Sequence, residues 1–205
     1  MQTIKIGEFN YSRTKIKNNI LKVYVKSLSS EKNDWYREAN QWAVDVSNFL
    51  HGFRGMKVSV KQVLGITSAL SPLKEWQNNK ELTVSMILTG DCGHMKNNKL
   101  KANKILMAHS SISDDDILKI LSGPKTSRFY MNMMYPNNGT GVTIDRHAIA
   151  IAIGRNATEK EQVMSDKVYT FVEDCYKMAA NRLGLTPLHL QSITWQAWKR
   201  IKATR

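Results

Sequence analysis

The sequence predicts an all-α fold, and three observations support this prediction. Apolar residues recur at helical spacing over most of the chain, capping residues precede several of these runs, and no stretch shows sustained alternation of apolar and polar residues. With 205 residues, of which 42% are hydrophobic, the chain is long enough to bury a core. We expect one compact domain or two small interlocked helical lobes.

The first half of the chain contains a basic N-terminal segment followed by helices. Residues 1–30 carry six basic residues and one acidic residue, and we interpret them as an arm or a first helix. Helices are predicted over residues 35–50 and 58–70, although the start of the second could also form a strand. Ser71-Pro72 begins a new segment. Residues 82–88 form a further apolar helical stretch.

Two short helices joined by a tight turn are predicted in the middle of the chain. Ser113 caps the first helix, and the acidic residues 114–116 suit the positive end of its dipole. Gly123-Pro124 ends this helix and starts the second, which runs to about Tyr135. Such a hairpin exposes backbone N–H groups that bind a phosphate without regard to base sequence. Most Gly-Pro turns, however, merely join two helices.

The segment after the hairpin places a carboxylate at the start of another helix. Residues 136–141 are the strongest turn signal in the chain, and residues 142–144 are extended. Asp145 can then cap the apolar helix formed by residues 148–153.

The last part of the chain is predicted to be helical up to the C-terminus. Thr158 to Glu161 has the pattern of a capping box. A long amphipathic helix then includes residues 168–183 and ends at Gly184, and Thr186-Pro187 starts the last helix.

The charge of the chain indicates a polyanionic partner. Lys and Arg number 30 and Asp and Glu number 17, which gives a net charge of +13. A field of this sign attracts phosphate chains and raises association rates. The basic residues lie in clusters, for example over residues 96–104, which favours nucleic acid over a generally basic surface. Taken alone, the cluster over residues 96–104 is explained equally well by a solvated helix face.

Cysteine usage and hydropathy limit the other classes of function. The two cysteines, Cys92 and Cys175, are too few for a disulfide scaffold, a four-cysteine metal site or an iron–sulfur site. Cys92-Gly93-His94 contains zinc-ligand types but lacks a second pair nearby, so we interpret Cys92 as a loop cysteine. We expect no metal, no cofactor, no signal peptide and no membrane contact. A reducing intracellular compartment fits best, the cytoplasm or nucleoid of a prokaryote or a phage-infected cell.

One stretch of the sequence resembles a known family of enzymes. Gly123-Pro124-Lys125-Thr126, followed by Val142-Thr143-Ile144-Asp145-Arg146-His147, resembles the core of the helix–hairpin–helix base-excision DNA glycosylases, the superfamily of endonuclease III and 8-oxoguanine glycosylase. Lys125 and Asp145 lie 145 − 125 = 20 positions apart, a spacing similar to that of the family. The hairpin departs from the family pattern because it is shorter and has one Gly only.

The resemblance implies an architecture and a partner. It implies two helical lobes with a cleft between them. In this arrangement residues 1–56 and 155–205 share one lobe, and residues 57–154 form the other, with the hairpin at 121–126 and the catalytic segment at 142–147. The implied partner is double-stranded DNA that contains a damaged or modified base, and the protein is expected to act as a monomer.

The resemblance also implies roles for individual residues. Asp145 would stabilise the positive charge that develops on the sugar, or deprotonate the attacking nucleophile. Lys125 would attack C1′ and form a Schiff base, which permits strand cleavage at the abasic site. Both residues would act on a nucleotide flipped out of the duplex.

The remaining candidate residues fall into two groups. The DNA-binding candidates are Ser122, Gly123, Thr126, Ser127, Arg128 and Arg146. The candidates for a base pocket are Trp76, Asn132 and His147. Residues such as Trp76 and Asn132 more often have core or surface roles, and a histidine such as His147 is more often packed or capping than catalytic.

Other readings of the same residues stay open. Asp145 could be a helix cap only, and Lys125 could contact phosphate or solvent only. The same scaffold could modify or exchange the flipped base instead of removing it. It could also be a non-catalytic DNA-binding or inhibitory module.

Overall fold

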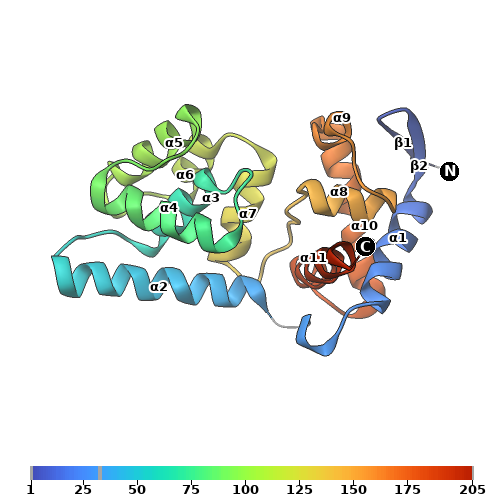
Figure 1. Cartoon of the computed structure of the whole chain (residues 1–205), viewed down its shortest axis with the longest axis horizontal. Helices are drawn as coiled ribbons and strands as arrows, with labels where there is room; N and C mark the ends of the chain where they lie inside the picture. The colour runs from blue at the N-terminus through green and yellow to red at the C-terminus, as the bar shows by residue number, and fades with distance from the viewer. Residues whose placement is uncertain (1, 32–33, 205) are drawn as a thin grey trace. The chain divides into compact units, whose positions relative to one another are not determined.

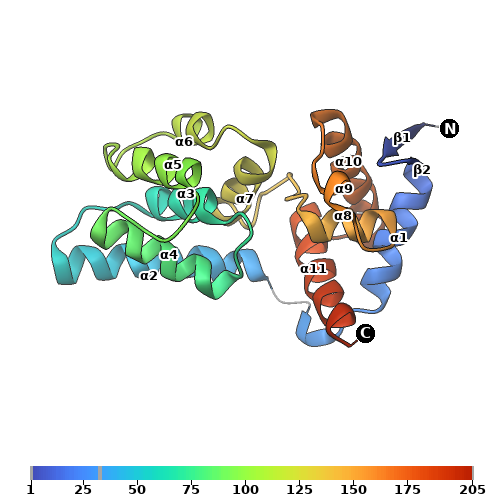
Figure 2. The same ribbon diagram turned by 45° about the horizontal axis from the view of Figure 1, so that its top comes forward.

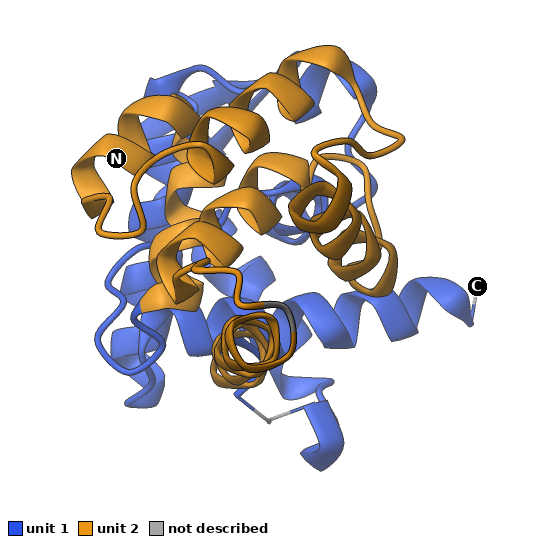
Figure 3. Ribbon diagram, turned by 90° about the vertical axis from the view of Figure 1, so that its left-hand side faces the viewer, with its two compact units in different colours: residues 1–36, 135–205 blue, residues 37–134 orange. Residues whose placement is uncertain are grey.

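The computed structural model describes residues 2–31 and 34–204. Within these residues it contains eleven α-helices, a short 3-10 helix and one two-stranded sheet, which confirms the prediction of an all-α protein (Figure 1). In the same residues, no helix is both long and apolar enough to cross a membrane. The chain divides into two compact units, which Figure 3 colours separately: residues 1–36 with 135–205 (unit 1), and residues 37–134 (unit 2).

Unit 1 is built around one apolar helix. Its elements are β1 (Thr3–Ile6), β2 (Phe9–Ser12), α1 (Arg13–Val25), η1 (Ser29–Glu31), α8 (Arg146–Ile153), α9 (Glu159–Gln162), α10 (Asp166–Leu183) and α11 (Pro187–Ala203). Every side chain of α8 from Ala148 to Ile153 is buried. A helix that is apolar all round must be covered on all sides, and α8 packs against α1 and α11 while α10 packs against both of these helices (Figure 1).

The C-terminal end of α8 is fixed by a glycine that another residue could not replace without strain. Gly154 has φ of +78° and donates its N–H to Ala150 O and Ile151 O. A Cβ atom at this position would lie 2.9 Å from Nδ2 of Asn19, which itself donates to Ala152 O. Backbone conformation and close packing therefore both require glycine here.

The N-terminus forms a β-hairpin, which the sequence analysis did not predict. The predicted first helix is present as α1, but β1 paired antiparallel with β2 precedes it. The alternation that marks β1 is confined to four residues, in which Ile4 and Ile6 are buried while Thr3 and Lys5 are exposed. Such a short pattern is a weak signal, and the strand exists because its partner and the core of unit 1 lie beside it.

Unit 2 is organised around α3. Its elements are α2 (Trp35–Arg54, from residue 37 onward), α3 (Val60–Leu70), α4 (Trp76–Thr89), α5 (Lys96–Leu106), α6 (Asp114–Leu121) and α7 (Pro124–Met134). Ser59 and Gln62 form a capping box at the start of α3. Residues 62–70 of α3 are all buried, because α4, α5, α6 and α7 pack around this helix (Figure 2).

Some predicted helix limits differ from the structure. Ser71-Pro72 lies in a turn instead of the first turn of a helix, and α4 is one continuous helix that includes the predicted stretch at 82–88. The capping box of Thr158 and Glu161 is confirmed, but it starts the short helix α9, which ends before Ser165 caps α10. Capping residues and prolines therefore indicate where a helix starts more reliably than how long it is.

The limits of the two units also differ from those of the two predicted lobes. Most of α2, which the sequence analysis placed with the termini, belongs to unit 2. Conversely, the segment at 142–147 and helix α8 belong to unit 1. The reason is that α8 forms the core against the helices near both termini, a tertiary contact that sequence spacing does not reveal.

Candidate functional site

The predicted helix–hairpin–helix is present in unit 2. Helix α6 is capped by Ser113, whose Oγ accepts from Asp116 N at 3.1 Å, and it ends at Ser122 in the left-handed conformation with φ of +55°. Helix α7 follows directly, and Ser127 N donates to Gly123 O at 3.0 Å. Gly123 is therefore the first residue whose carbonyl takes part in α7.

The start of α7 presents backbone donors and basic side chains. In the first turn of a helix the N–H groups have no acceptor within the helix, and here these include the N–H groups of Lys125 and Thr126. Pro124 lacks this donor. Lys125 is half-buried and Arg128 is exposed in the same turn of the chain. An anion would meet both the helix dipole and these cations.

Two of the predicted DNA-contacting hydroxyl groups are used inside the protein. Oγ of Ser122 accepts from Lys101 Nζ at 2.9 Å, and the same ammonium donates to Leu121 O at 2.6 Å. Oγ1 of Thr126 donates to Gly123 O at 3.3 Å and to Leu121 O at 3.5 Å. The proton of the Thr126 hydroxyl therefore points toward the hairpin itself, which shifts the expected phosphate contacts to the backbone N–H groups and the cations.

Asp145 lies in unit 1, at the N-terminus of α8. Its Oδ1 accepts from His147 N at 3.0 Å and from Ala148 N at 2.7 Å, so the predicted cap is confirmed. Among the described residues, no hydrogen bond reaches the other carboxylate oxygen, Oδ2. The side chain is half-buried. One oxygen thus holds the helix, and the second remains available to a substrate.

The extended segment before Asp145 is held by side chains from α10. Val142 N donates to Oε1 of the buried Glu173 at 2.9 Å. The hydroxyl of Tyr169 accepts from Ile144 N at 3.0 Å and donates to Val142 O at 2.8 Å. Three backbone groups of this segment are therefore fixed by two side chains. This arrangement restricts the position of Asp145, which is what a reacting carboxylate requires.

Removal of the Tyr169 hydroxyl is expected to loosen this segment. In Tyr169→Phe the buried N–H of Ile144 loses its acceptor, which should lower the free energy of unfolding by about 1–2 kcal/mol. Tyr11→Phe is a matched control, because the hydroxyl group of this buried tyrosine accepts one long hydrogen bond, from Arg155 at 3.5 Å. Urea unfolding of both variants followed by circular dichroism measures the difference. Equal losses of unfolding free energy in the two variants would show that the hydrogen bonds of the Tyr169 hydroxyl do not stabilise this segment.

Lys125 and Asp145 belong to different units of the structure. Their convergence on one sugar therefore stays a prediction. Lys125 belongs with the hairpin, together with Ser122, Gly123, Thr126, Ser127 and Arg128. Asp145 belongs with Arg146 and His147.

The three base-pocket candidates have different surroundings. In unit 2, the half-buried Trp76 contacts Trp42 edge to face at 5.4 Å between ring centroids, and Asn132 on α7 is only 1% exposed. In unit 1, the His147 ring lies edge-on to Trp195 at 6.3 Å. Burial lowers the pKa of His147, and the charge of Arg146 adds to this effect while Asp145 opposes it. The lowered pKa favours the neutral form of His147.

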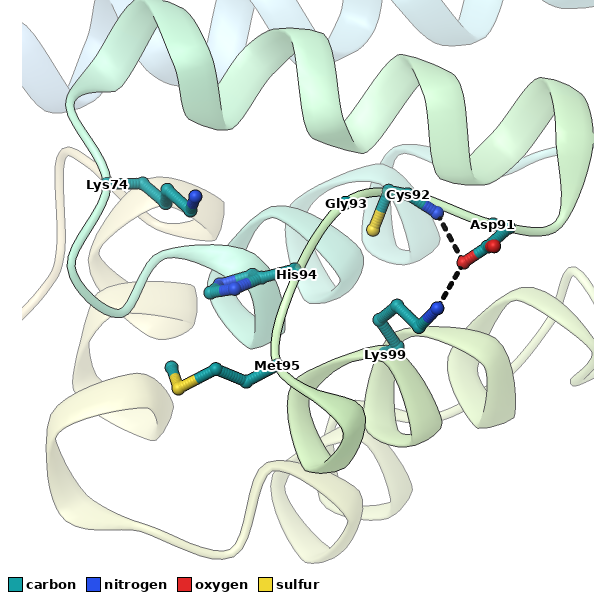
Figure 4. Close-up of a pocket in the computed structure, with 7 residues that line it drawn as sticks. All are labelled: Lys74, Asp91, Cys92, Gly93, His94, Met95 and Lys99. Carbon is teal, nitrogen blue, oxygen red and sulfur yellow. Dashed lines mark hydrogen bonds and ion pairs between the residues drawn. The ribbon is translucent and has the colours of Figure 1, made fainter.

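An open pocket of about 470 Å³ lies at the loop before α5 (Figure 4). Asp91 accepts from Lys99 Nζ and from Cys92 N, and Nε2 of His94 lies 2.9 Å from Leu70 O. Burial raises the pKa of the Cys92 thiol. Within the residues that the structure describes, no group of three or more His, Cys, Asp or Glu side chains could hold a metal ion.

The side chains that hold the segment before Asp145, and those that lie near or act on His147, were not among the predicted site residues. Tyr169 and Glu173 on α10, and Trp195, Lys199 and Lys202 on α11, are distant from Asp145 in the sequence. Trp195, Trp198 and the basic residues that follow them stand out in the sequence, but nothing in this pattern points to α8.

Comparison with known proteins assigns the chain to a family. A family described as a family of unknown function (DUF7178) has a sequence model that matches residues 3–202. The chain belongs to this family, because the match covers nearly its whole length. A search of curated proteins and a search of solved structures each gave no match.

Proposed function

We propose that this member of the DUF7178 family is a DNA glycosylase, which flips a damaged or modified base out of DNA and cleaves its N-glycosidic bond. The proposal rests on the hydrogen bonds of the Asp145 carboxylate and of the segment before it. Its Oδ1 caps α8, its Oδ2 accepts no hydrogen bond from the described residues, and the segment before it is held by Tyr169 and Glu173. The resemblance of the sequence around Lys125 and Asp145 to base-excision glycosylases supports the same activity.

The proposed reaction uses the negative charge of Asp145. As the bond between C1′ and the base breaks, its electron pair leaves with the base, and positive charge develops on the sugar. A carboxylate close to C1′ stabilises this charge. It can also take a proton from the water molecule whose oxygen bonds to C1′. Access to C1′ requires that the nucleotide leave the base stack.

The charge of each unit suits a polyanionic substrate. Unit 1 contains 17 Lys and Arg residues and 9 Asp and Glu residues, a net charge of 17 − 9 = +8. Unit 2 contains 13 and 8 of these residues, a net charge of 13 − 8 = +5. Both units therefore attract a phosphate backbone, and this supports double-stranded DNA as the partner of either one.

Lys125 is the proposed nucleophile of an additional abasic-site lyase activity. Its uncharged amine would attack C1′, and the base would leave with the electron pair of the broken bond. The nitrogen would then lose a proton and the bond between C1′ and the ring oxygen would open, which gives a Schiff base that permits strand cleavage. Among the described residues, the ammonium group of Lys125 makes no ion pair. The proposal for Lys125 is tested separately from that for Asp145, because a glycosylase can use a water molecule as the nucleophile and needs no lysine for base release.

Borohydride is expected to trap the wild-type protein covalently on a cleaved substrate, because it reduces a Schiff base to a stable amine. The variant Lys125→Ala should give no adduct, and a denaturing gel of labelled DNA measures the yield. Lys119→Ala is the control, since this lysine is exposed on α6 with 76% of its side-chain surface accessible. An undiminished adduct with Lys125→Ala would exclude Lys125 as the nucleophile.

A panel of DNA duplexes tests the activity itself. Duplexes that contain uracil, 8-oxoguanine or hypermodified pyrimidines are incubated with the full chain, and abasic sites and released bases are measured by mass spectrometry. Abasic sites with free base would support the glycosylase. An altered or exchanged base in intact DNA would instead identify a base-modifying enzyme. DNA binding without any change of the nucleosides would identify a non-catalytic module.

We further propose that the protein acts inside the cell, where its DNA substrate lies. Cys92 and Cys175 are both free and buried, which suits a reducing compartment. The chemistry proposed for Asp145 and Lys125 needs neither a metal ion nor an organic cofactor.

A further inference from the structure

Helix α2 has a second apolar face beside its buried one. The buried face includes Ala39, Ala43 and Leu50, which are each at most 2% exposed. The second face consists of apolar residues at positions i, i+4, i+7 and i+11, which lie on one side of a helix. We call this face the α2 stripe and define it as Trp42, Val46, Phe49 and Phe53.

The C-terminal half of the α2 stripe is exposed. Phe49 is 63% exposed and Phe53 is 71% exposed, and their rings stack with 5.3 Å between centroids and 13° between planes. Trp42 and Val46, in the other half, are half-buried. Single apolar side chains are normal on a protein surface. Two phenylalanine rings that continue a helical stripe instead form a contiguous patch, and such a patch marks an interaction site.

Gly52 lies next to the two rings in the sequence. A Cβ atom at this position would meet none of the described atoms within 4 Å, and the φ angle of Gly52 is not positive. Neither packing nor backbone conformation therefore requires glycine here, although glycine stabilises a helix less than alanine does. The missing side chain allows another backbone to approach this turn of α2 closely.

The charge around the α2 stripe favours a protein partner over a nucleic acid. Residues 38–53 contain two acidic residues and no Lys or Arg, although the whole chain has a net charge of +13. A phosphate backbone would find no lysine or arginine on this segment. A second copy of this basic chain would meet no repulsion from such residues here. Aromatic residues without cations are also typical of the buried centre of a protein interface.

The α2 stripe is complementary to itself when two copies of α2 lie antiparallel. A two-fold axis that passes between positions 47 and 48 pairs Trp42 of one copy with Phe53 of the other, and Val46 with Phe49. The same arrangement places the acidic N-terminal half of one helix near the C-terminal end of the other. The exposed Lys57 follows that end, so opposite charges meet at both ends of the helix pair.

We propose that the α2 stripe is the interface of a homodimer, in which α2 of one copy packs antiparallel against α2 of a second copy. The inference does not depend on the proposed function. It differs from the monomer that the resemblance to glycosylases implies. One helix pair is a small interface, so we expect a weak dimer that dissociates at micromolar concentrations.

Sedimentation equilibrium of the full chain at about 1 to 100 µM tests the inference, because a small interface dissociates in this range. The mass of the wild type should rise from that of one chain toward that of two. Phe49→Gln/Phe53→Gln should raise the dissociation constant at least about 100-fold, since each copy loses two buried rings. The matched control is Leu100→Gln/Met107→Gln, which removes two other apolar side chains of unit 2, 50% and 77% exposed, and should dimerise as the wild type does.

A second variant tests the close approach of the two helices. The side chain introduced by Gly52→Gln would enter open space in a single chain, so the fold should be kept. In the dimer it would lie between the helices and should raise the dissociation constant at least about 10-fold. A dissociation constant unchanged by Gly52→Gln would overturn the close antiparallel packing. Circular dichroism verifies that all variants are folded.

Two other results would overturn the inference as a whole. One is a wild type that keeps the mass of one chain at every concentration. The other is a dimer that Phe49→Gln/Phe53→Gln leaves unchanged. Titration of a labelled single-stranded oligonucleotide identifies the alternative ligand. If the wild type is monomeric and the double phenylalanine variant binds the oligonucleotide more weakly than the control does, the α2 stripe stacks on bases instead.

Discussion

The variant Asp145→Asn is expected to lose at least about 100-fold in base release, while it folds and binds DNA as the wild type does. The substitution removes the negative charge that would stabilise the sugar cation. It keeps an oxygen that can accept from His147 N and Ala148 N, the two hydrogen bonds that now reach Oδ1 of Asp145. Asparagine is as good an N-cap as aspartate, so α8 should remain intact.

Asp145→Ala provides the comparison that separates the two roles of this residue. Alanine removes both the charge and the cap, which should lower the free energy of unfolding by about 1 kcal/mol. A single-turnover assay on whichever duplex the wild type cleaves measures the activity, and urea unfolding measures the stability. If Asp145→Asn keeps full activity and only Asp145→Ala is impaired, Asp145 is a helix cap and the proposed mechanism is wrong.

Local signals in the sequence predicted the parts of this protein that carry the candidate chemistry. Ser113, Gly123 and Pro124 fix the ends of α6 and α7 through capping and backbone conformation, and Asp145 caps α8. These features depend on residues within a few positions of each other, so a single sequence contains the information.

The surroundings of Asp145 could not be predicted in the same way. Tyr169 and Ile144 are 25 positions apart, and Glu173 and Val142 are 31 positions apart, yet they are hydrogen-bonded. Which helices cover α8 is decided by packing of the whole unit, and the same packing gives most of α2 to unit 2. The short hairpin of β1 and β2 was missed for a related reason, because tertiary contact outweighs a pattern of four residues.

Tertiary contacts also predict that substitution of Glu161 in unit 1 lowers the free energy of unfolding by a large amount. This glutamate is only 4% exposed, and Arg155 donates to both of its carboxylate oxygens, at 2.6 and 2.9 Å. Thr158 donates to Oε2 from its N–H at 2.9 Å and from its hydroxyl at 3.1 Å. The hydrogen bonds from Arg155, together with those from Thr158, lower the pKa of Glu161 to about 2. The carboxylate therefore links the end of α8 to the capping box of α9.

The lowered pKa makes the stability of unit 1 dependent on pH in a defined direction. A carboxyl group that is more acidic in the folded state stabilises the fold at all pH values above its unfolded pKa, here 4.5. The contribution is lost as the pH falls from about 4.5 toward 2, because in this range the unfolded chain binds a proton at Glu161 and the folded protein does not. We expect Glu161→Gln to lower the free energy of unfolding at pH 7 by about 2–3 kcal/mol, since Arg155 loses its charged partner. The difference between variant and wild type should shrink steadily toward pH 2.

Urea unfolding at a series of pH values measures this effect, and hydrogen exchange of α8 and α10 shows whether unit 1 is the part that weakens. Glu159→Gln is the matched control, because Glu159 is exposed on the same short helix. Its substitution should change the free energy of unfolding by less than about 0.5 kcal/mol at every pH. Only an ionised carboxylate produces a difference in the free energy of unfolding that disappears in acid. If the free energy of unfolding of Glu161→Gln is lower than that of the wild type by the same amount at pH 7 and pH 2, the loss of stability comes from packing.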